Sequence, residues 1–194
     1  MTLDALLAAL IFEQSGDLEI AHSEIPLMNT QGLWHGSAAI FEKIDFAKKI
    51  FVANLRASHD LDLNLIAKNA SGKPHAKIGL TRRREFGAVL NKYSMATAES
   101  ITWYAMGDRE KIHKLLSEVE FIGKRRASGY GQVTNLQIED ADLDGVVGHF
   151  GEPLRPVPLD LFVGDKASLK VDASWKPAYW HPANRAVCFV PENV

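Results

Sequence analysis

The sequence predicts an α+β domain, and three observations support this class. An apolar helical period occupies residues 2–13, and the order strand, helix, glycine-rich loop, strand spans residues 100–138. A proline-rich segment then runs from residue 145 to residue 194. A chain of 194 residues with 46% hydrophobic content is most simply one domain, since a chain of this size buries about 70% of its unfolded surface. We therefore expect a single domain over residues 1–194.

The first element is a helix over residues 2–13. Its apolar residues recur at the three- and four-residue spacing of one helical face, and they are Leu3, Leu6, Leu7, Leu10 and Ile11. Gly16 is expected to end this helix, because glycine is the usual residue after a helix C-terminus.

Residues 33–97 form a long, basic and irregular segment. Residues 61–65 alternate leucine with polar residues, which is typical of a strand, and residues 69–74 contain the turn residues Asn, Ser, Gly and Pro. We interpret the segment as hairpins and loops inserted into the domain.

A second compact stretch starts near Ser100. Apolar and polar residues alternate over residues 101–105, which predicts a strand. Asp108 is suited to cap a helix whose apolar stripe contains Ile112, Leu115, Leu116 and Val119. A strand is expected at residues 132–138, and the proline-rich residues 145–194 are expected to wrap the domain as a tail.

Charge is distributed unevenly, although the formal net charge is only −2. Residues 1–42 contain six acids and no lysine or arginine, residues 43–133 contain 17 bases and nine acids, and residues 134–194 contain five bases and nine acids. A basic middle between acidic ends is typical of a molecule with one cationic face, but an ordinary solvated surface explains it equally well. Charge alone leaves nucleic-acid binding open.

The stretch GKRRASGYGQV, Gly123 to Val133, combines three glycines with three bases and contains no acid. Gly123, Gly129 and Gly131 permit positive φ, and consecutive backbone N–H groups in such turns bind anions. The stretch is not a mononucleotide-binding loop, because a base rather than Ser or Thr follows its Gly-Lys pair. It also lacks the third glycine of a dinucleotide fingerprint.

The side chains of this loop are suited to a phosphodiester backbone with unpaired bases. Lys124, Arg125 and Arg126 can neutralise phosphates. Ser128 can donate to a phosphate, or alternatively cap the turn, and Tyr130 can stack on a base. We favour RNA contact over the alternative of a solvated turn.

Residues 123–131 lie between a predicted helix and a predicted strand. In this position and composition they resemble the glycine-rich loop of the RAMP proteins of CRISPR systems. Three further stretches are similar to the Cas-five-like subunit of type IV CRISPR effector complexes, namely LDALLA at residues 3–8, GLWHGSA at 32–38 and LRPVP at 154–158. The chain departs from the family pattern in one respect, since no strand precedes the helix at residues 2–13.

This resemblance implies a ferredoxin-like (RRM-like) RAMP domain, with residues 33–97 as a thumb-like β-hairpin insertion. It implies a noncatalytic subunit that caps the 5′ handle of the CRISPR RNA. Its partners would be Cas-seven-like backbone subunits and a large, Cas-eight-like subunit, which it would help to engage target DNA beside the flanking motif. In such complexes base pairing reads the target, while protein holds backbone and motif.

Further candidate RNA-binding residues lie outside the glycine-rich loop. Arg82, Arg83 and Arg84 lie in the thumb-like insertion, where a hydrated charge run is an equally good interpretation. Trp34 and His35 lie between two glycines, although burial is the commoner fate of a tryptophan. A C-terminal aromatic group, which we expect to pack the tail onto the domain, contains Trp175, Tyr179, Trp180 and His181.

Two other functions remain open. A CRISPR-RNA-processing endoribonuclease of the same fold needs a general base, for which the candidates are His22, His35, His113 and Tyr130. A purely structural assembly subunit is the third possibility. We expect no catalytic residue and no cofactor. We also expect no metal, because no two histidines have the close spacing of metal ligands.

The sequence also bears on the cellular compartment. Cys188 is the only cysteine, so an internal disulfide is excluded, and a reducing cytoplasm is expected. The longest apolar run, residues 5–12, is shorter than the roughly 20 residues of a membrane-spanning helix. No membrane association is expected.

Overall fold

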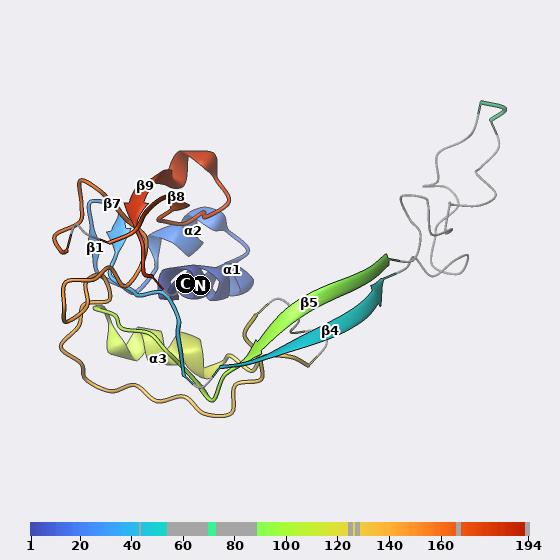
Figure 1. Ribbon diagram of the computed structural model, residues 1–194, viewed down its shortest axis with the longest axis horizontal. Coiled ribbons are helices and arrows are strands. Elements are labelled where there is room, and N and C mark those ends of the chain that lie inside the picture. The colour runs from blue at the N-terminus through green and yellow to red at the C-terminus, as the bar shows by residue number, and fades with distance from the viewer. Residues whose placement is uncertain are drawn as a thin grey trace. The chain divides into compact units, whose positions relative to one another are not determined.

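The computed structural model describes residues 1–42, 44–53, 70–72, 89–123, 126, 129–165 and 168–192. The chain divides into two compact units. Unit 1 contains Met1–Glu42 and Glu99–Val194, and unit 2 contains Lys43–Ala98. The described residues form a mixed α/β structure with few helices and small antiparallel sheets (Figure 1).

The described part of unit 1 contains three α-helices, and the sequence predicted the C-terminus of the first and the N-terminus of the third. Helix α1 spans Leu3–Ser15, and Gly16 ends it at φ 69°, with its N–H donating to the Phe12 carbonyl at 2.8 Å, which confirms the predicted helix and its stop. Helix α2 spans Leu18–Ser23. Helix α3 spans Arg109–Ser117, and the Asp108 carboxylate accepts from a backbone N–H of its first turn, as predicted.

The helices enclose the first of two hydrophobic clusters in unit 1. Its buried members come from all three helices and the chain between them, and they are Leu3, Leu6, Leu7, Ala8, Ile11, Ala21, Ile25, Leu27 and Ile112. Helix α1 contributes most of these side chains, because its apolar stripe repeats at helical spacing. Leu115 and Leu116 of α3, which the sequence placed on the same stripe as Ile112, pack against this cluster.

The strands of unit 1 are short. Strands β1 (Asn29–Thr30) and β2 (Leu33–Trp34) pair with each other, as do β3 (Ile40–Glu42) and β6 (Ser100–Thr102). Between them, residues 26–28, 35–37 and 104–108 exchange single backbone hydrogen bonds and make isolated bridges. The described residues therefore contain small sheets, without the continuous four-stranded sheet of a ferredoxin-like domain.

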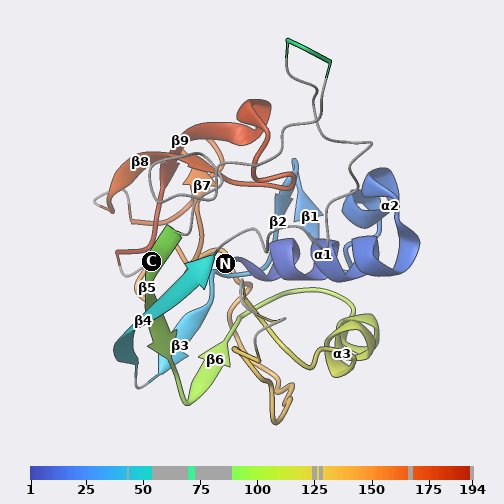
Figure 2. The same cartoon turned by 90° about the vertical axis from the view of Figure 1, so that its right-hand side faces the viewer.

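The C-terminal tail contains a sheet that the sequence did not predict. Strands β7 (Val157–Pro158), β9 (Arg185–Phe189) and β8 (Lys170–Ser174) pair antiparallel in that order (Figure 2). A short 3₁₀ helix, η3 (Pro182–Asn184), precedes β9. Phe162 and Phe189 meet at a centroid distance of 4.8 Å in the second cluster, whose other buried members are Leu33, Val146 and Val157.

In unit 2, strands β4 (Asp45–Ala53) and β5 (Val89–Thr97) pair antiparallel over their full nine-residue length (Figure 1). Residues 70–72 form a turn, within the turn expected at residues 69–74. Residues 33–42, which we had assigned to the insertion, lie in unit 1. The predicted strand at residues 61–65 lies outside the described residues.

Candidate nucleic-acid interface

The glycine-rich stretch is the turn of a short hairpin that follows α3. The N–H of Ile122 donates to the Gly131 carbonyl at 2.8 Å, and the N–H of Val133 donates to the Glu120 carbonyl at 2.8 Å. Phe121 and Gln132 form the bridge between these two bonds. The described residues on either side of the stretch, 120–122 and 131–133, therefore lie beside each other.

The prediction of a strand at residues 132–138 is wrong beyond this bridge. After Val133, the described chain makes no further strand pairing up to Asp140. The carbonyl of Ile138 instead accepts from the Arg109 guanidinium at 2.7 Å, and Asp140 forms an ion pair with the same arginine at 2.7 Å. A side chain of α3 thus supplies a hydrogen bond of the kind that a neighbouring strand would have made.

The three glycines of the turn adopt conformations that other residues avoid. Gly123, Gly129 and Gly131 have φ values of 107°, 76° and 78°. A Cβ on Gly131 would lie 1.8 Å from the Ile122 carbonyl oxygen, so this glycine is required to close the hairpin. A Cβ on Gly123 or Gly129 would meet no atom within 4 Å. Those two positions lie in open space, where a ligand can approach the backbone closely.

The side chains of the turn are described only in part. Arg126 is exposed, and its guanidinium forms an ion pair with Glu13 at 2.8 Å. Both residues line a shallow hollow that also contains Leu10 and residues 118–121, of which two are glutamates. Tyr130 is half-buried. Lys124, Arg125 and Ser128 lie outside the described residues.

Trp34 and His35 occupy different surroundings. Trp34 is half-buried and packs against the cluster around α1. His35 lies between two polar side chains, with Nδ1 at 3.2 Å from an Asp144 carboxylate oxygen and Nε2 at 3.0 Å from the Thr30 hydroxyl. The Nδ1–carboxylate contact lies within ion-pair distance but is not aligned as a hydrogen bond. Sequence reasoning missed the pairing with Asp144, which lies more than 100 positions away.

The second basic cluster, Arg82, Arg83 and Arg84, lies outside the described residues. The described part of the thumb-like insertion is the β4–β5 ladder, one face of which is exposed. On that face lie Phe46, Ile50 and Leu90, with exposed fractions of 70%, 58% and 56%, together with Lys48 and Lys92. This face, hereafter the hairpin face, combines apolar and cationic side chains.

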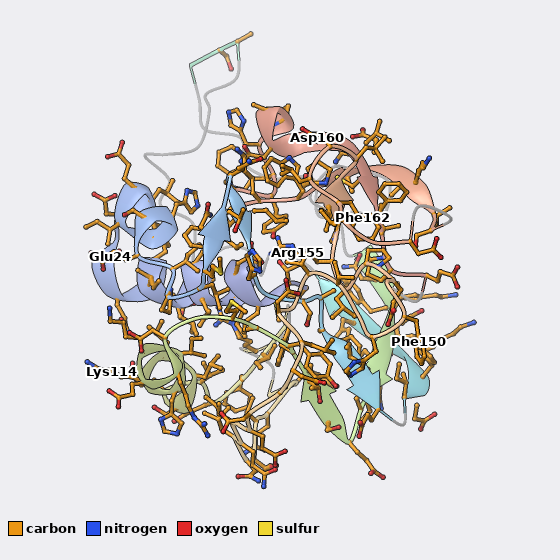
Figure 3. All side chains as sticks on the ribbon, turned by 90° about the vertical axis from the view of Figure 1, so that its left-hand side faces the viewer. Glu24, Lys114, Phe150, Arg155, Asp160 and Phe162 are labelled. Carbon is orange, nitrogen blue, oxygen red and sulfur yellow. The ribbon has the colours of Figure 1, made fainter. Side chains whose placement is uncertain are left out.

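The three stretches that carry the family resemblance meet at one buried side chain, Arg155. Its side chain is fully buried, and Figure 3 shows it inside unit 1. Its guanidinium contacts an Asp4 carboxylate oxygen at 3.2 Å and donates to the Gly36 carbonyl at 3.0 Å and to the Trp34 carbonyl. Residues 3–8, 32–38 and 154–158 are thus joined in space around one arginine.

Tyr179 completes this buried network. Its hydroxyl donates to the Asp4 carboxylate at 2.7 Å and accepts from Arg155 at 2.9 Å and from Thr2 at 2.8 Å. Burial raises the pKa of the Tyr179 phenol far above its usual value, so the phenol remains a neutral donor. Asp4 and Arg155 are fully buried and Tyr179 is half-buried, and we interpret the network as structural.

The aromatic side chains of the C-terminal tail differ in how far they are buried. Trp175 packs against the second cluster and Tyr179 joins the buried network, as expected for residues that hold the tail in place. Trp180, by contrast, is 75% exposed.

The described residues contain neither a membrane-spanning helix nor a group of metal ligands. No described helix combines the length and the apolar character that a membrane crossing requires. Within the described ranges, no three side chains of His, Cys, Asp or Glu are grouped so that they could hold a metal ion.

Fold and site together define a mixed α/β protein whose third helix leads into a glycine-rich, basic hairpin turn. The family model described as CRISPR type IV associated protein Csf3 matches residues 42–191. The chain belongs to this family, the Cas-five-like subunit of type IV CRISPR systems, which confirms the membership that the sequence predicted. No curated protein matches the chain.

Proposed function

We propose that this chain is the noncatalytic RNA-binding subunit of a cytoplasmic type IV CRISPR ribonucleoprotein, built on a RAMP domain of the ferredoxin-like type whose sheet is divided into short ladders and isolated bridges. It caps the 5′ handle of the CRISPR RNA and contacts Cas-seven-like backbone subunits. It also helps a Cas-eight-like large subunit engage target DNA next to the flanking motif.

The observation that carries this proposal is the glycine-rich turn. It follows α3 directly, its backbone is in the left-handed region at three glycines, and two of these glycines lie in open space. The sequence between them supplies three bases and no acid. Backbone N–H groups and guanidinium groups in such a turn bind phosphate oxygens without reading bases, as a cap on an RNA end requires.

Unit 2 supports an extended RNA and protein contact. Over Lys43–Ala98 the sequence contains eleven bases and four acids, a formal charge of +7. The hairpin face adds apolar side chains beside Lys48 and Lys92. Bases neutralise RNA phosphates, and exposed apolar side chains favour a protein neighbour, which together suit a thumb between guide RNA and a backbone subunit.

The experiment that tests the proposal is purification of the chain with its neighbouring gene products, followed by sequencing of the retained RNA. We expect one class of CRISPR RNA with a uniform 5′ end, protected from nuclease by complexes that contain this chain. Complexes assembled without it should retain RNA with ragged 5′ ends. Uniform, protected 5′ ends in complexes that lack this chain would contradict the capping role.

The endoribonuclease is kept as a second candidate because of one observation, the position of His35 between Asp144 and Thr30. A carboxylate beside an imidazole is one part of the usual arrangement of a general base. Repeat RNA incubated with the protein in the absence of metal should remain intact under the noncatalytic proposal. A discrete product that disappears in His35→Ala and persists in His22→Ala would favour the endoribonuclease instead.

A further inference from the structure

Two of the most exposed apolar side chains of unit 1 lie on adjacent loops. Phe150 is 92% exposed and Val163 is 89% exposed. Figure 3 shows Phe150 apart from Arg155, the buried side chain near the centre of the same view. Burying a phenylalanine or valine side chain is favourable, so a folded protein that displays both has left an apolar surface without a partner.

The loop of Phe150 is a tight hairpin turn with a fixed backbone. The N–H of Gly148 donates to the Glu152 carbonyl at 2.8 Å, and the N–H of Gly151 donates to the Gly148 carbonyl at 3.0 Å. The N–H of Phe150 itself donates to the Glu152 carboxylate at 2.9 Å. These bonds hold the backbone of Phe150, so its exposure is built into the turn.

The loop of Val163 is anchored by the residue before it. The N–H groups of Leu161 and Phe162 both donate to the Pro158 carbonyl at 3.1 Å, and the Phe162 ring is buried against Phe189. With Phe162 fixed in the second cluster, the next side chain remains outside it.

The two loops are joined through their backbones. The N–H of Asp165 donates to the Gly151 carbonyl at 2.7 Å. A Cβ on Gly164 would lie 2.4 Å from that same carbonyl oxygen, so only glycine permits the contact. Phe150 precedes Gly151 and Val163 precedes Gly164, so the two exposed apolar residues lie on joined stretches of backbone, and together they are hereafter called the Phe150 surface.

The two loops that carry the Phe150 surface are acidic. Residues 148–152 and 159–165 contain three acids, Glu152, Asp160 and Asp165, and no lysine or arginine. The next base along the chain, Lys166, lies outside the described residues. Glu152 and Asp165 belong to the two loops themselves. A polyanion is repelled from such a surface, whereas a cationic protein surface is attracted to it.

We infer that the Phe150 surface is a docking site for another protein, one that offers an apolar pocket rimmed by lysine or arginine side chains. Phe150 enters the pocket as the aromatic anchor, and the surrounding carboxylates meet the basic rim. The inference rests on the proposed function only in that this protein is a subunit of the same type IV complex. It assigns to the acidic side of unit 1 a protein contact that is separate from the RNA contact of the glycine-rich turn.

The test places a photocrosslinking amino acid, p-benzoyl-L-phenylalanine, at position 150 of the full chain in the assembled ribonucleoprotein. We expect one dominant crosslink to another protein subunit, within an apolar segment that has lysine or arginine close by. A dominant crosslink to RNA, to target DNA or to a second copy of this chain would overturn the inference, and so would no crosslink at all.

A binding measurement provides a second test of the docking site. The double variant Phe150→Ala, Val163→Ala should bind the crosslinked subunit at least tenfold more weakly than the wild type. The matched control is Phe12→Ala, Leu18→Ala, which removes one aromatic and one aliphatic side chain that are 41% and 49% exposed on α1 and α2. Equal losses in both double variants would overturn the inference.

The two proposals fail in different ways. Absence of RNA from the wild-type complex would contradict the RNA-capping function while leaving the crosslink to be observed. Normal RNA retention without a protein crosslink at position 150 would contradict the docking site alone.

Discussion

Unit 1 and unit 2 differ in both charge and burial. Unit 1 contains eleven bases and twenty acids, a formal charge of −9, whereas unit 2 reaches +7 in only 56 residues. Unit 1 buries two hydrophobic clusters and the Arg155–Asp4 ion pair. In the described part of unit 2, no side chain is buried, and Phe46, Ile50 and Leu90 are more than half exposed.

This difference indicates a division of roles. Unit 1 is stabilised by contacts within itself, so substitutions in its interior should change the stability of the free chain. The side chains of the hairpin face make few such contacts, so substitutions there should change assembly and leave stability nearly unaltered. The predictions below test this contrast, starting with the largest effect.

The buried ion pair of unit 1 should give the largest change. Arg155→Leu leaves the buried Asp4 carboxylate without its cation and removes the guanidinium that donates to three backbone carbonyls. Removing one partner of a buried pair typically costs about 3–5 kcal/mol. We therefore expect a loss of this size in the free energy of unfolding, measured by urea denaturation monitored with tryptophan fluorescence.

The exposed pair Arg185–Asp172 is the matched control. Its nitrogen–oxygen distance of 3.1 Å is close to the 3.2 Å of the Arg155–Asp4 pair, but its side chains are 47% and 65% exposed. Arg185→Leu should cost about 0–1 kcal/mol, because solvent screens such pairs. Similar losses in the two variants would contradict the interpretation of the Arg155 network as the centre of unit 1.

The glycine-rich turn should give an intermediate effect that differs between two glycines. Gly129→Ala introduces only the left-handed strain of roughly 1–2 kcal/mol, since its Cβ meets open space. Gly131→Ala adds a clash with the Ile122 carbonyl, so its free energy of unfolding should fall further. Equal stability of the two variants would show that the hairpin closure described here is wrong.

The sequence predicted the helices better than the sheets, for physical reasons. Helix α1 and its stop at Gly16 follow from local spacing and local capping. The prediction of a strand at residues 132–138 was wrong because the Ile138 carbonyl accepts from the Arg109 side chain and not from a neighbouring strand. No local sequence pattern specifies such a partner. The β7–β9–β8 sheet pairs residues up to 32 positions apart, as in Val157 with Phe189, and strands this short leave little alternation to detect.

The candidate site was only partly predictable. The glycine-rich turn could be found because glycines and bases are informative by type. The Asp4–Arg155 pair left one detectable signal, an acid on the inward face of an otherwise apolar helix, next to Leu3 and Leu7. The Phe150 surface left none, since a single phenylalanine in a loop is as readily buried as exposed.

The hairpin face should affect assembly more than stability. Phe46→Ser with Ile50→Ser removes exposed apolar side chains, so the free energy of unfolding should change by less than about 0.5 kcal/mol. Incorporation into the ribonucleoprotein, measured against wild-type chain in a competition assay, should fall several-fold. A large drop in stability with normal incorporation would mean that this face packs within the free chain.

The smallest expected effect concerns the reactivity of the Cys188 thiol and its contribution to stability at high pH. Burial raises the pKa of its thiol to about 11, so the thiol stays protonated at pH 8 and should react slowly with a maleimide until urea unfolds the protein. The raised pKa favours the neutral thiol in the folded state. Its contribution to stability is complete below the unfolded pKa of about 8.5 and is lost as the pH rises towards 11. Native labelling at the unfolded rate would contradict the burial.

The most direct test of the RNA-capping proposal is the salt dependence of RNA binding by the assembled complex. Replacing Lys124, Arg125 and Arg126 by alanine removes three cations from the glycine-rich turn, and each cation paired with a phosphate contributes about 0.7 to the slope for single-stranded RNA. The control variant replaces Lys111 and Lys114 of α3 and the exposed Arg185 of β9 by alanine, which changes the net charge equally. We predict weaker RNA retention and a slope flatter by up to about 2 in the turn variant, with the control close to wild type. An unchanged slope in the turn variant, or equal changes in both variants, would contradict the proposal.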